Sequence, residues 1–368
     1  MSKKTTIIIF LVFIGITIPI LLVTAAGKWT ILREDDIIRD DGIEGMLHDV
    51  HFMDNQNGMV VGDKGLVLVT ADGGKTWKKK EINTRPAGAP TGQRPGGPPG
   101  GGAPGGGFGG GGLPTLYNIY FVNEDIGFLT GARGMILKTE DGGKTWKRKM
   151  ARSQAANQNN NNRRRGGGIR SSLMGVQMIT EKVGFIVGTE NAILKTTDGG
   201  ETWVGSSERA RVGETRNNLE NILFVSPTTG WIIGSYGTLL HTTDGGENWE
   251  KKNAGFDNNL FGIHFADEKT GWISGQEGLI LHTADGGKTW KQQKTDSIDN
   301  LYDIMFVDKM VGWAVGEYSA VLHTTDGGKT WSATKAGGSG ALKGVHATDK
   351  NHCWTVDDWG VIAAYKTE

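Results

Sequence analysis

Six copies of one short motif, T-x-D-G-G-K-T-W with small variations, hold the residues of this chain that are most suited to chemistry. Four copies contain Gly-Lys-Thr, which is typical of the end of a phosphate-binding loop. Each copy also has one aspartate, which could serve as a calcium ligand or as a general acid or base. The aspartates are Asp72, Asp141, Asp198, Asp244, Asp285 and Asp326, and the tryptophans are Trp77, Trp146, Trp203, Trp249, Trp290 and Trp331.

The surroundings of these motifs exclude phosphate and calcium loops. A phosphate-binding loop needs a glycine five positions before its second glycine, and the chain has Val69, Lys138, His282 and His323 there. A calcium loop needs several acidic ligands, whereas each copy supplies one. We therefore predict that each aspartate accepts hydrogen bonds from threonines and backbone N–H groups of its own turn, and that each tryptophan covers that turn. We expect no catalytic, cofactor-binding or metal-binding residue in these motifs.

The spacing of the motifs predicts the fold. The last three aspartates are 41 residues apart, and each full repeat begins with a leucine 30 positions before its tryptophan. Within a repeat, short apolar runs alternate with period two, as in Ile304 and Phe306, and turn residues separate them. This length and pattern are typical of one blade of a β-propeller. We predict an all-β fold, a seven-bladed β-propeller of four-stranded antiparallel blades.

The seventh repeat begins at Leu342 and ends at Glu368 before it reaches a motif. Its fourth strand is therefore missing at this end of the chain. Residues 28–33 resemble the end of a motif followed by its strand. We predict that this segment, with Trp29 and Ile31, completes the last blade and closes the ring, because closure removes free sheet edges.

The sequence divides into an N-terminal segment, 1–26, and a propeller, 28–368. Lys3 and Lys4 precede an uncharged run from Ile7 to Val23, and small residues follow it, which is typical of a signal peptide or of an uncleaved membrane anchor. Either alternative predicts an exported protein on the periplasmic or extracytoplasmic face of a membrane. Three insertions, at about 86–114, 152–170 and 206–218, are rich in glycine and proline, in asparagine, or in arginine, and their composition predicts flexible loops.

Charge is balanced over the whole chain but unevenly placed. Forty acidic residues match 40 Lys and Arg residues, so nothing in the net charge indicates a nucleic-acid partner. All 14 arginines lie at or before Arg216. The insertions connect a fourth strand to the next first strand, so we expect them on one face with the turns between second and third strands. Their arginines are candidate residues for binding an acidic partner: Arg163, Arg164, Arg165, Arg209, Arg211 and Arg216.

Two further groups of residues deserve a chemical interpretation. His241, His282 and His323 occupy one equivalent position on third strands, so they splay apart and are expected to pack rather than to bind a metal. The lone Cys353 is expected to be a buried thiol.

The repeat resembles the Asp-box propellers, also called bacterial neuraminidase repeats. The pattern L-x-x-I-x-F…G-W-x-V-G…G-x-I-L-H-T-x-D-G-G-K-T-W is most similar to the photosystem II stability and assembly factor family, over residues 28–368 apart from the insertions. The resemblance implies a seven-bladed, non-catalytic protein on the lumenal or periplasmic side that binds a subunit of a membrane complex. It implies a protein partner and no cofactor.

A glycoside hydrolase of the Asp-box type is the alternative. A sialidase-like site needs an arginine trio, and the last four blades contain no arginine. A two-carboxylate hydrolase could instead use Glu317, Asp357 or Asp358, which lie at turns between second and third strands with Tyr318 and Trp359.

Overall fold

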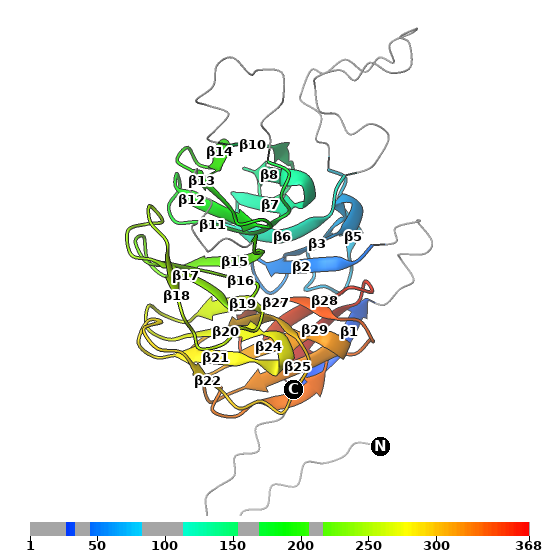
Figure 1. The fold of residues 1–368 in the computed structure, drawn as a ribbon. Helices are drawn as coiled ribbons and strands as arrows, with labels where there is room; N and C mark the ends of the chain where they lie inside the picture. The colour runs from blue at the N-terminus through cyan, green and yellow to red at the C-terminus, as the bar shows by residue number, and fades with distance from the viewer. Residues whose placement is uncertain (1–26, 34–44, 83–112, 154–168, 206–215, 368) are drawn as a thin grey trace, which may run out of the picture.

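The structure is a computed structural model, and it describes residues 27–33, 45–82, 113–153, 169–205 and 216–367. Seven small sheets are arranged around a central axis, so the prediction of a seven-bladed all-β propeller is confirmed (Figure 1). The first strands of the blades contact one another in order around the axis, and β2 of blade one contacts β27 of blade seven. The ring is therefore closed.

Blades one to three contain strands β2 to β14. Blade one consists of β2 (Leu47–Phe52), β3 (Gly58–Gly62), β4 (Val67–Thr70) and β5 (Lys78–Lys79). Blade two consists of β6 (Leu116–Phe121), β7 (Gly127–Gly131), β8 (Met135–Thr139) and β9 (Lys147–Arg148). Blade three consists of β11 (Leu173–Met178), β12 (Gly184–Gly188), β13 (Ala192–Thr196), β14 (Thr202–Gly205) and the added β10 (Met150–Ser153).

Blades four to seven contain the remaining strands. Blade four consists of β15 (Leu219–Phe224), β16 (Gly230–Gly234), β17 (Thr238–Thr242) and β18 (Glu250–Lys252). Blade five consists of β19 (Leu260–Phe265), β20 (Gly271–Gly275), β21 (Ile280–Thr283) and β22 (Lys291–Gln292). Blade six consists of β23 (Leu301–Phe306), β24 (Gly312–Gly316), β25 (Ala320–Thr324) and β26 (Ser332–Lys335). Blade seven consists of β27 (Leu342–Asp349), β28 (His352–Asp357), β29 (Ile362–Lys366) and β1 (Lys28–Arg33).

The core of the protein lies between the blades. Each of the seven hydrophobic clusters contains residues of two neighbouring blades. The second strands are buried along their whole length in every blade but the seventh, where only the first residue of β28 is half-buried. Each blade thus needs a neighbour on both sides to remove its apolar surface from water.

The first and last strands of the chain close the ring, as the sequence predicts. β1 pairs antiparallel with β29, and Trp29 lies opposite Tyr365 with ring centroids 5.6 Å apart. Trp29 is buried in the cluster that joins blades six and seven. The strand from the N-terminal region therefore supplies both a hydrogen-bonded edge and part of the core.

The structure corrects the predicted bounds of two insertions. Arg152, placed in the second insertion, belongs to β10, which pairs parallel with β14 and gives blade three a fifth strand. Asn217, placed in the third insertion, is buried and donates from Nδ2 to Thr238 Oγ1 at 2.8 Å. Neither segment shows an alternating apolar pattern that would predict its place, and hydrogen bonds to the neighbouring blade fix both of them. Most of each insertion lies outside the described residues.

The N-terminal segment, 1–26, also lies outside the described residues. Within the part of the chain that the structure covers, no helix is long and apolar enough to cross a membrane.

Ring closure yields the first testable prediction. Trp29→Ala leaves a cavity where a large aromatic side chain packs, so we expect the free energy of unfolding to fall by roughly 3–5 kcal/mol. Urea unfolding followed by tryptophan fluorescence measures this change. Ile298→Ala is the control, because Ile298 is 86% exposed and its removal should change the free energy by less than about 0.5 kcal/mol. Equal stability of the two variants would contradict closure through Trp29.

Candidate functional site

The repeated motifs form braced hairpins. In blade one, Asp72 Oδ1 accepts hydrogen bonds from Thr70 Oγ1 at 2.8 Å and from Thr76 N at 2.9 Å, while Oδ2 accepts from Thr76 Oγ1 at 2.6 Å. These bonds hold the pKa of Asp72 at about 2. The other five aspartates make the equivalent bonds, with Asn248 in place of the second threonine in blade four. Both oxygens of each carboxylate are therefore engaged by its own turn.

The two glycines of each motif adopt backbone angles that other residues rarely take, with φ of 75° at Gly73 and 87° at Gly74. The tryptophans cover the hairpins: Trp77, Trp146 and Trp203 are buried, and Trp249, Trp290 and Trp331 are partly buried against the same clusters. None of the six aspartates lines either of the two cavities described below. The three histidines also pack, since each contacts the tryptophan beside it on the second strand of its blade.

The opposite face of the ring carries the turns between second and third strands and the connections between blades. Leu113, at the end of the first insertion, packs against Gly65 in the turn η1 (Asp63–Gly65), which places these two kinds of loop together. The residue at the tip of the turn differs from blade to blade. In chain order these tip residues are Lys64, Arg133, Glu190, Tyr236, Glu277, Tyr318 and Trp359.

A central cavity of about 170 Å³ lies on the axis of the ring and is lined by the second and third residues of the first strands. These residues also differ between blades, in contrast to the motifs. They are His48, Asp49, Tyr117, Asn118, Met174, Glu220, Asn221, Phe261, Tyr302, Asp303 and Lys343. We call this cavity, together with the tip residues around it, the channel face.

One side of the channel face joins a cation, an aromatic ring and two carboxylates. Lys343 Nζ lies 3.8 Å from the centroid of the Tyr302 ring and 3.7 Å from Asp358 Oδ2. Tyr302 donates its hydroxyl hydrogen bond to Glu317 Oε1 at 3.1 Å, and burial raises the pKa of this phenol. The cluster holds its charges in a fixed arrangement between blades six and seven, as a recognition site requires.

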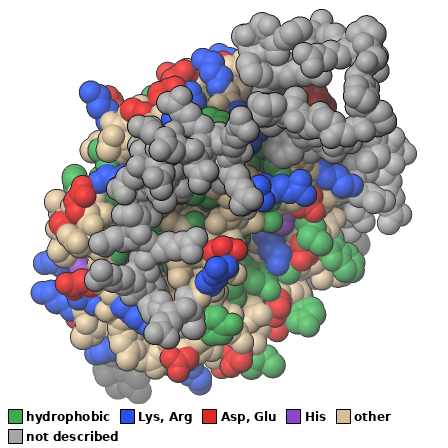
Figure 2. All heavy atoms as spheres, turned by 45° about the horizontal axis from the view of Figure 1, so that its top comes forward, with side chains coloured by type: hydrophobic (Ala, Val, Ile, Leu, Met, Phe, Trp, Pro, Cys, Tyr) green, Lys and Arg blue, Asp and Glu red, His purple; other side chains and the backbone are tan. Residues whose placement is uncertain are grey.

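The other side of the channel face carries groups of both signs. Nε2 of His48 lies 2.9 Å from Asp63 Oδ1, which also accepts a hydrogen bond from Thr115 Oγ1. Across the cavity, burial raises the pKa of Glu220. Charged groups of both signs are interspersed over the part of the surface shown in Figure 2.

Deeper in the channel, Asp49 and Asp303 join neighbouring blades. Asp49 Oδ2 accepts from the backbone N–H of Ile119 in blade two at 2.9 Å, and Asp303 Oδ2 accepts from that of Val345 in blade seven at 3.0 Å. Burial raises the pKa of Asp49 to about 8 and that of Asp303 to about 7. The other oxygen of each carboxylate, Oδ1, accepts from the backbone N–H of the next residue in its own strand. Because each side chain thus holds the backbone of its own strand and that of the next blade, we interpret both as links between blades.

The carboxylates of the hydrolase alternative accept hydrogen bonds from their own turn or from the adjoining chain segment that precedes the first strand of the same blade. Glu317 accepts from Asn300 N and Nδ2, Asp357 Oδ1 accepts from Trp359 N and Val361 N, and Asp358 Oδ1 accepts from Ala341 N. Asp357 is buried. These bonds give no two of them the open pair of carboxylates that glycoside hydrolysis uses.

Of the six candidate arginines, the structure describes only Arg216. Its Nη1 lies 3.7 Å from Glu190 Oε2 at the tip of the blade-three turn, and its side chain is mostly exposed. It therefore lies on the channel face. Arg163, Arg164, Arg165, Arg209 and Arg211 lie outside the described residues, so their role stays a prediction.

The sequence model of the photosynthesis system II assembly factor YCF48 family matches residues 37–88, 113–165, 167–254, 206–297 and 249–368. The chain belongs to this family. A comparison with curated proteins found no match.

Several solved structures share the fold. YCF48 from Cyanidioschyzon merolae is 18% identical with a TM-score of 0.63, and the alignment covers 93% of this chain and 99% of that one. A structure of YCF48 bound to D1 peptide is 17% identical with a TM-score of 0.64, covering 93% and 97%. An inactive variant of virginiamycin B lyase from Staphylococcus aureus is 11% identical with a TM-score of 0.67, covering 92% and 99%. At these identities the likeness shows the propeller fold, which both binding proteins and enzymes use.

Sequence reasoning missed the residues that line the channel. The sequence contains one signal for them, because the second residue of the first strand differs in chemical type among the seven repeats, from Lys343 to Glu220 and Phe261.

The raised pKa of Asp303 yields the second prediction. Between pH 4 and about 7 the folded state holds a proton that the unfolded state has lost, so the contribution of Asp303 to stability should fall as pH rises through this range and level off above it. Asp303→Asn cannot titrate. We expect the melting temperature of the native chain minus that of this variant to fall from pH 4 to 7, as measured by thermal unfolding. A difference that grows with pH would contradict the assignment.

Proposed function

We propose that this chain is a non-catalytic binding protein that assists the assembly or stability of a membrane complex by holding a segment of one subunit on the channel face. Membership of the YCF48 family supports this role, and one relative of similar fold was solved with a D1 peptide bound. The proposal includes export to the extracytoplasmic side of a membrane, which the N-terminal segment 1–26 supports as a signal peptide or anchor.

The observation that carries the proposal is a set of exposed aromatic side chains at the tips of turns. Tyr236, Tyr318 and Trp359 are 71%, 65% and 62% exposed, and all three lie on the channel face. The two tyrosines have φ near +54°, a left-handed conformation that is unusual for a bulky residue. Exposed rings stabilise a fold little, but they supply rigid apolar area and a polar group to a protein interface.

The direction of β1 relates this face to the membrane. β1 pairs antiparallel with β29, so it begins on the face of the motifs and ends on the channel face. If segment 1–26 is retained as an anchor, the motif face is held toward the membrane and the channel face points away from it. This orientation leaves the channel face open to a soluble segment of a membrane subunit.

The third prediction concerns the aromatic tips. Tyr318→Ala combined with Trp359→Ala should reduce at least tenfold the amount of partner recovered when the tagged chain is purified from native membranes, because aromatic residues at the centre of an interface supply much of its affinity. Met310→Ala is the control, since Met310 is an exposed apolar residue of the motif face. Quantitative mass spectrometry measures the recovery. Unchanged recovery with the double variant would contradict binding at this face.

The fourth prediction concerns the arginines of the second insertion. Replacing Arg163, Arg164 and Arg165 with alanine should weaken recovery of an acidic partner, and the native interaction should weaken as salt increases. The matched control removes three exposed positive charges from outer strands, with Lys251, Lys291 and Lys335 changed to alanine. Equal loss in both triple variants would show an effect of net charge, and would contradict a specific role for the insertion.

A further inference from the structure

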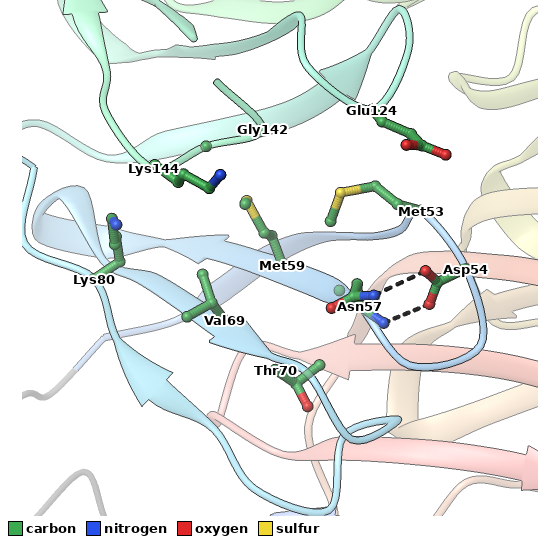
Figure 3. A pocket seen from close by; sticks show the side chains of 12 residues that line it. Met53, Asp54, Asn57, Met59, Val69, Thr70, Lys80, Glu124, Gly142 and Lys144 are labelled. Carbon is green, nitrogen blue, oxygen red and sulfur yellow. Dashed lines mark hydrogen bonds between the residues drawn. The ribbon is translucent and has the colours of Figure 1, made fainter. Parts of the chain in front are cut away.

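A second cavity, of about 310 Å³, opens on the motif face at the boundary between blades one and two. It lies on the opposite face from the channel and is independent of the proposed function. Met53, Met59 and Val69 form its apolar wall, and Gly142, Gly143 and Lys144 of the second motif form the facing side (Figure 3).

The cavity arises from a departure from the repeat. One equivalent position on the second strand is aromatic in six of the seven blades: Phe128, Phe185, Trp231, Trp272, Trp313 and, at the third residue of β28, Trp354. In blade one this residue is Met59. Its neighbour across the strand pair is also smaller than in blades four to six, with Val69 where those blades have a histidine.

In other blades the aromatic ring fills the boundary to the next blade. Trp354 stacks on Phe52 with centroids 3.6 Å apart, and its Nε1 donates to the carbonyl of Gly73 in the next motif at 3.2 Å. Trp272 stacks on Phe306 at 3.5 Å and donates to Gly327 in the same way. At the blade-one boundary the second glycine of the next motif, Gly143, is covered by the flexible end of Met59 and by the edge of Trp146, with no ring from the second strand.

The boundary between blades one and two also lacks an ion pair that is present at the next two boundaries. Between blades two and three, Lys138 Nζ lies 2.9 Å from Glu201 Oε1 in the next motif, and Lys195 pairs with Glu247 one boundary further. Between blades one and two the same two positions hold Val69 and Lys144. The boundary thus lacks the ring and the ion pair that fill or close its neighbours.

Charge is segregated along the opening. Lys80 and Lys144 lie toward one end, Asp54 and Glu124 toward the other, and the two methionines lie between them (Figure 3). Asp54 accepts hydrogen bonds from the backbone of Gln56 and Asn57 and from Asn57 Nδ2, so its own loop satisfies its carboxylate. The ammonium groups of Lys80 and Lys144 make the other end of the opening complementary to an acidic group.

We propose that this cavity binds an aromatic side chain of a partner protein, followed in the partner's sequence by an acidic residue. The guest ring lies against Met53 and Met59, in the space left because Met59 is smaller than the aromatic residue of the other blades, and its acidic neighbour meets Lys80 and Lys144. The volume is at the lower end of the range for ligand pockets. Methionine side chains adapt their shape and make favourable contacts with aromatic rings, which suits Met53 and Met59 to an exchangeable guest.

The test uses the full chain labelled with ¹³C at the methionine methyl groups and titrated with the peptide N-acetyl-Trp-Glu-amide. We expect a saturable ring-current shift of the Met53 and Met59 methyl signals, and no shift of Met305 in the centre of the ring. N-acetyl-Ala-Glu-amide should leave the signals in place, and N-acetyl-Trp-Lys-amide should bind at least tenfold more weakly.

Two variants and one control complete the test. Met59→Trp restores the ring of the repeat, so it should abolish the shift of Met53 while the chain stays folded. Lys144→Glu should weaken binding of the Trp-Glu peptide at least fivefold, whereas Lys329→Glu, at the equivalent position of the sixth motif, should leave it unchanged. Methyl signals that do not move with the peptide, or that move equally in Met59→Trp, would overturn the proposal and identify the cavity as a packing defect. These readouts do not involve the channel face, so they succeed or fail independently of the proposed function.

Discussion

Every blade of this propeller depends on contact with the next one. A single four-stranded sheet has two apolar faces and cannot bury either of them alone, so stability comes from the seven boundaries. At most boundaries an aromatic ring of the second strand reaches the paired glycines of the next motif, as Trp231 does at Gly287 and Phe128 at Gly200. Only glycine leaves room for this approach and accepts the backbone angles of the hairpin. The motif therefore stabilises its own turn and also forms the surface against which the aromatic ring of the neighbouring blade packs.

The same constraint explains the strand from the N-terminal region. Blade seven has no motif, so blade six cannot insert Trp313 against paired glycines as Trp231 does. Instead the ring of Trp313 lies 5.6 Å from that of Tyr365, which packs in turn against Trp29. β1 thus supplies, from a distant part of the sequence, both the missing hydrogen-bonded strand and the missing aromatic packing.

Positions that repeat and positions that vary have different roles in this ring. The motif aspartates, glycines and tryptophans recur because each boundary poses the same packing problem. The tip residues and the second residues of the first strands do not fill the motif hairpins, and they range from Lys343 to Glu220 and from Arg133 to Tyr318. A single asymmetric partner that covers several blades is recognised through residues that differ between them. The channel face and the cavity beside Met59 are two places where the blades differ.

The sequence alone determined the fold, the number of blades and the closing strand, because a 41-residue period and a β-strand alternation are local properties that each repeat restates. It could not place Arg152 in an added strand or Asn217 in the core, since both positions depend on hydrogen bonds to another part of the ring. The candidate site was predictable only in part: Glu317, Asp358 and Trp359 were expected on one face, but their partners were not. Tyr302 and Lys343 are 41 residues apart and meet only because two blades lie side by side around the axis. Closure of the whole ring sets the distances between blades. For this reason only the tertiary structure decided the central cavity and the cavity beside Met59.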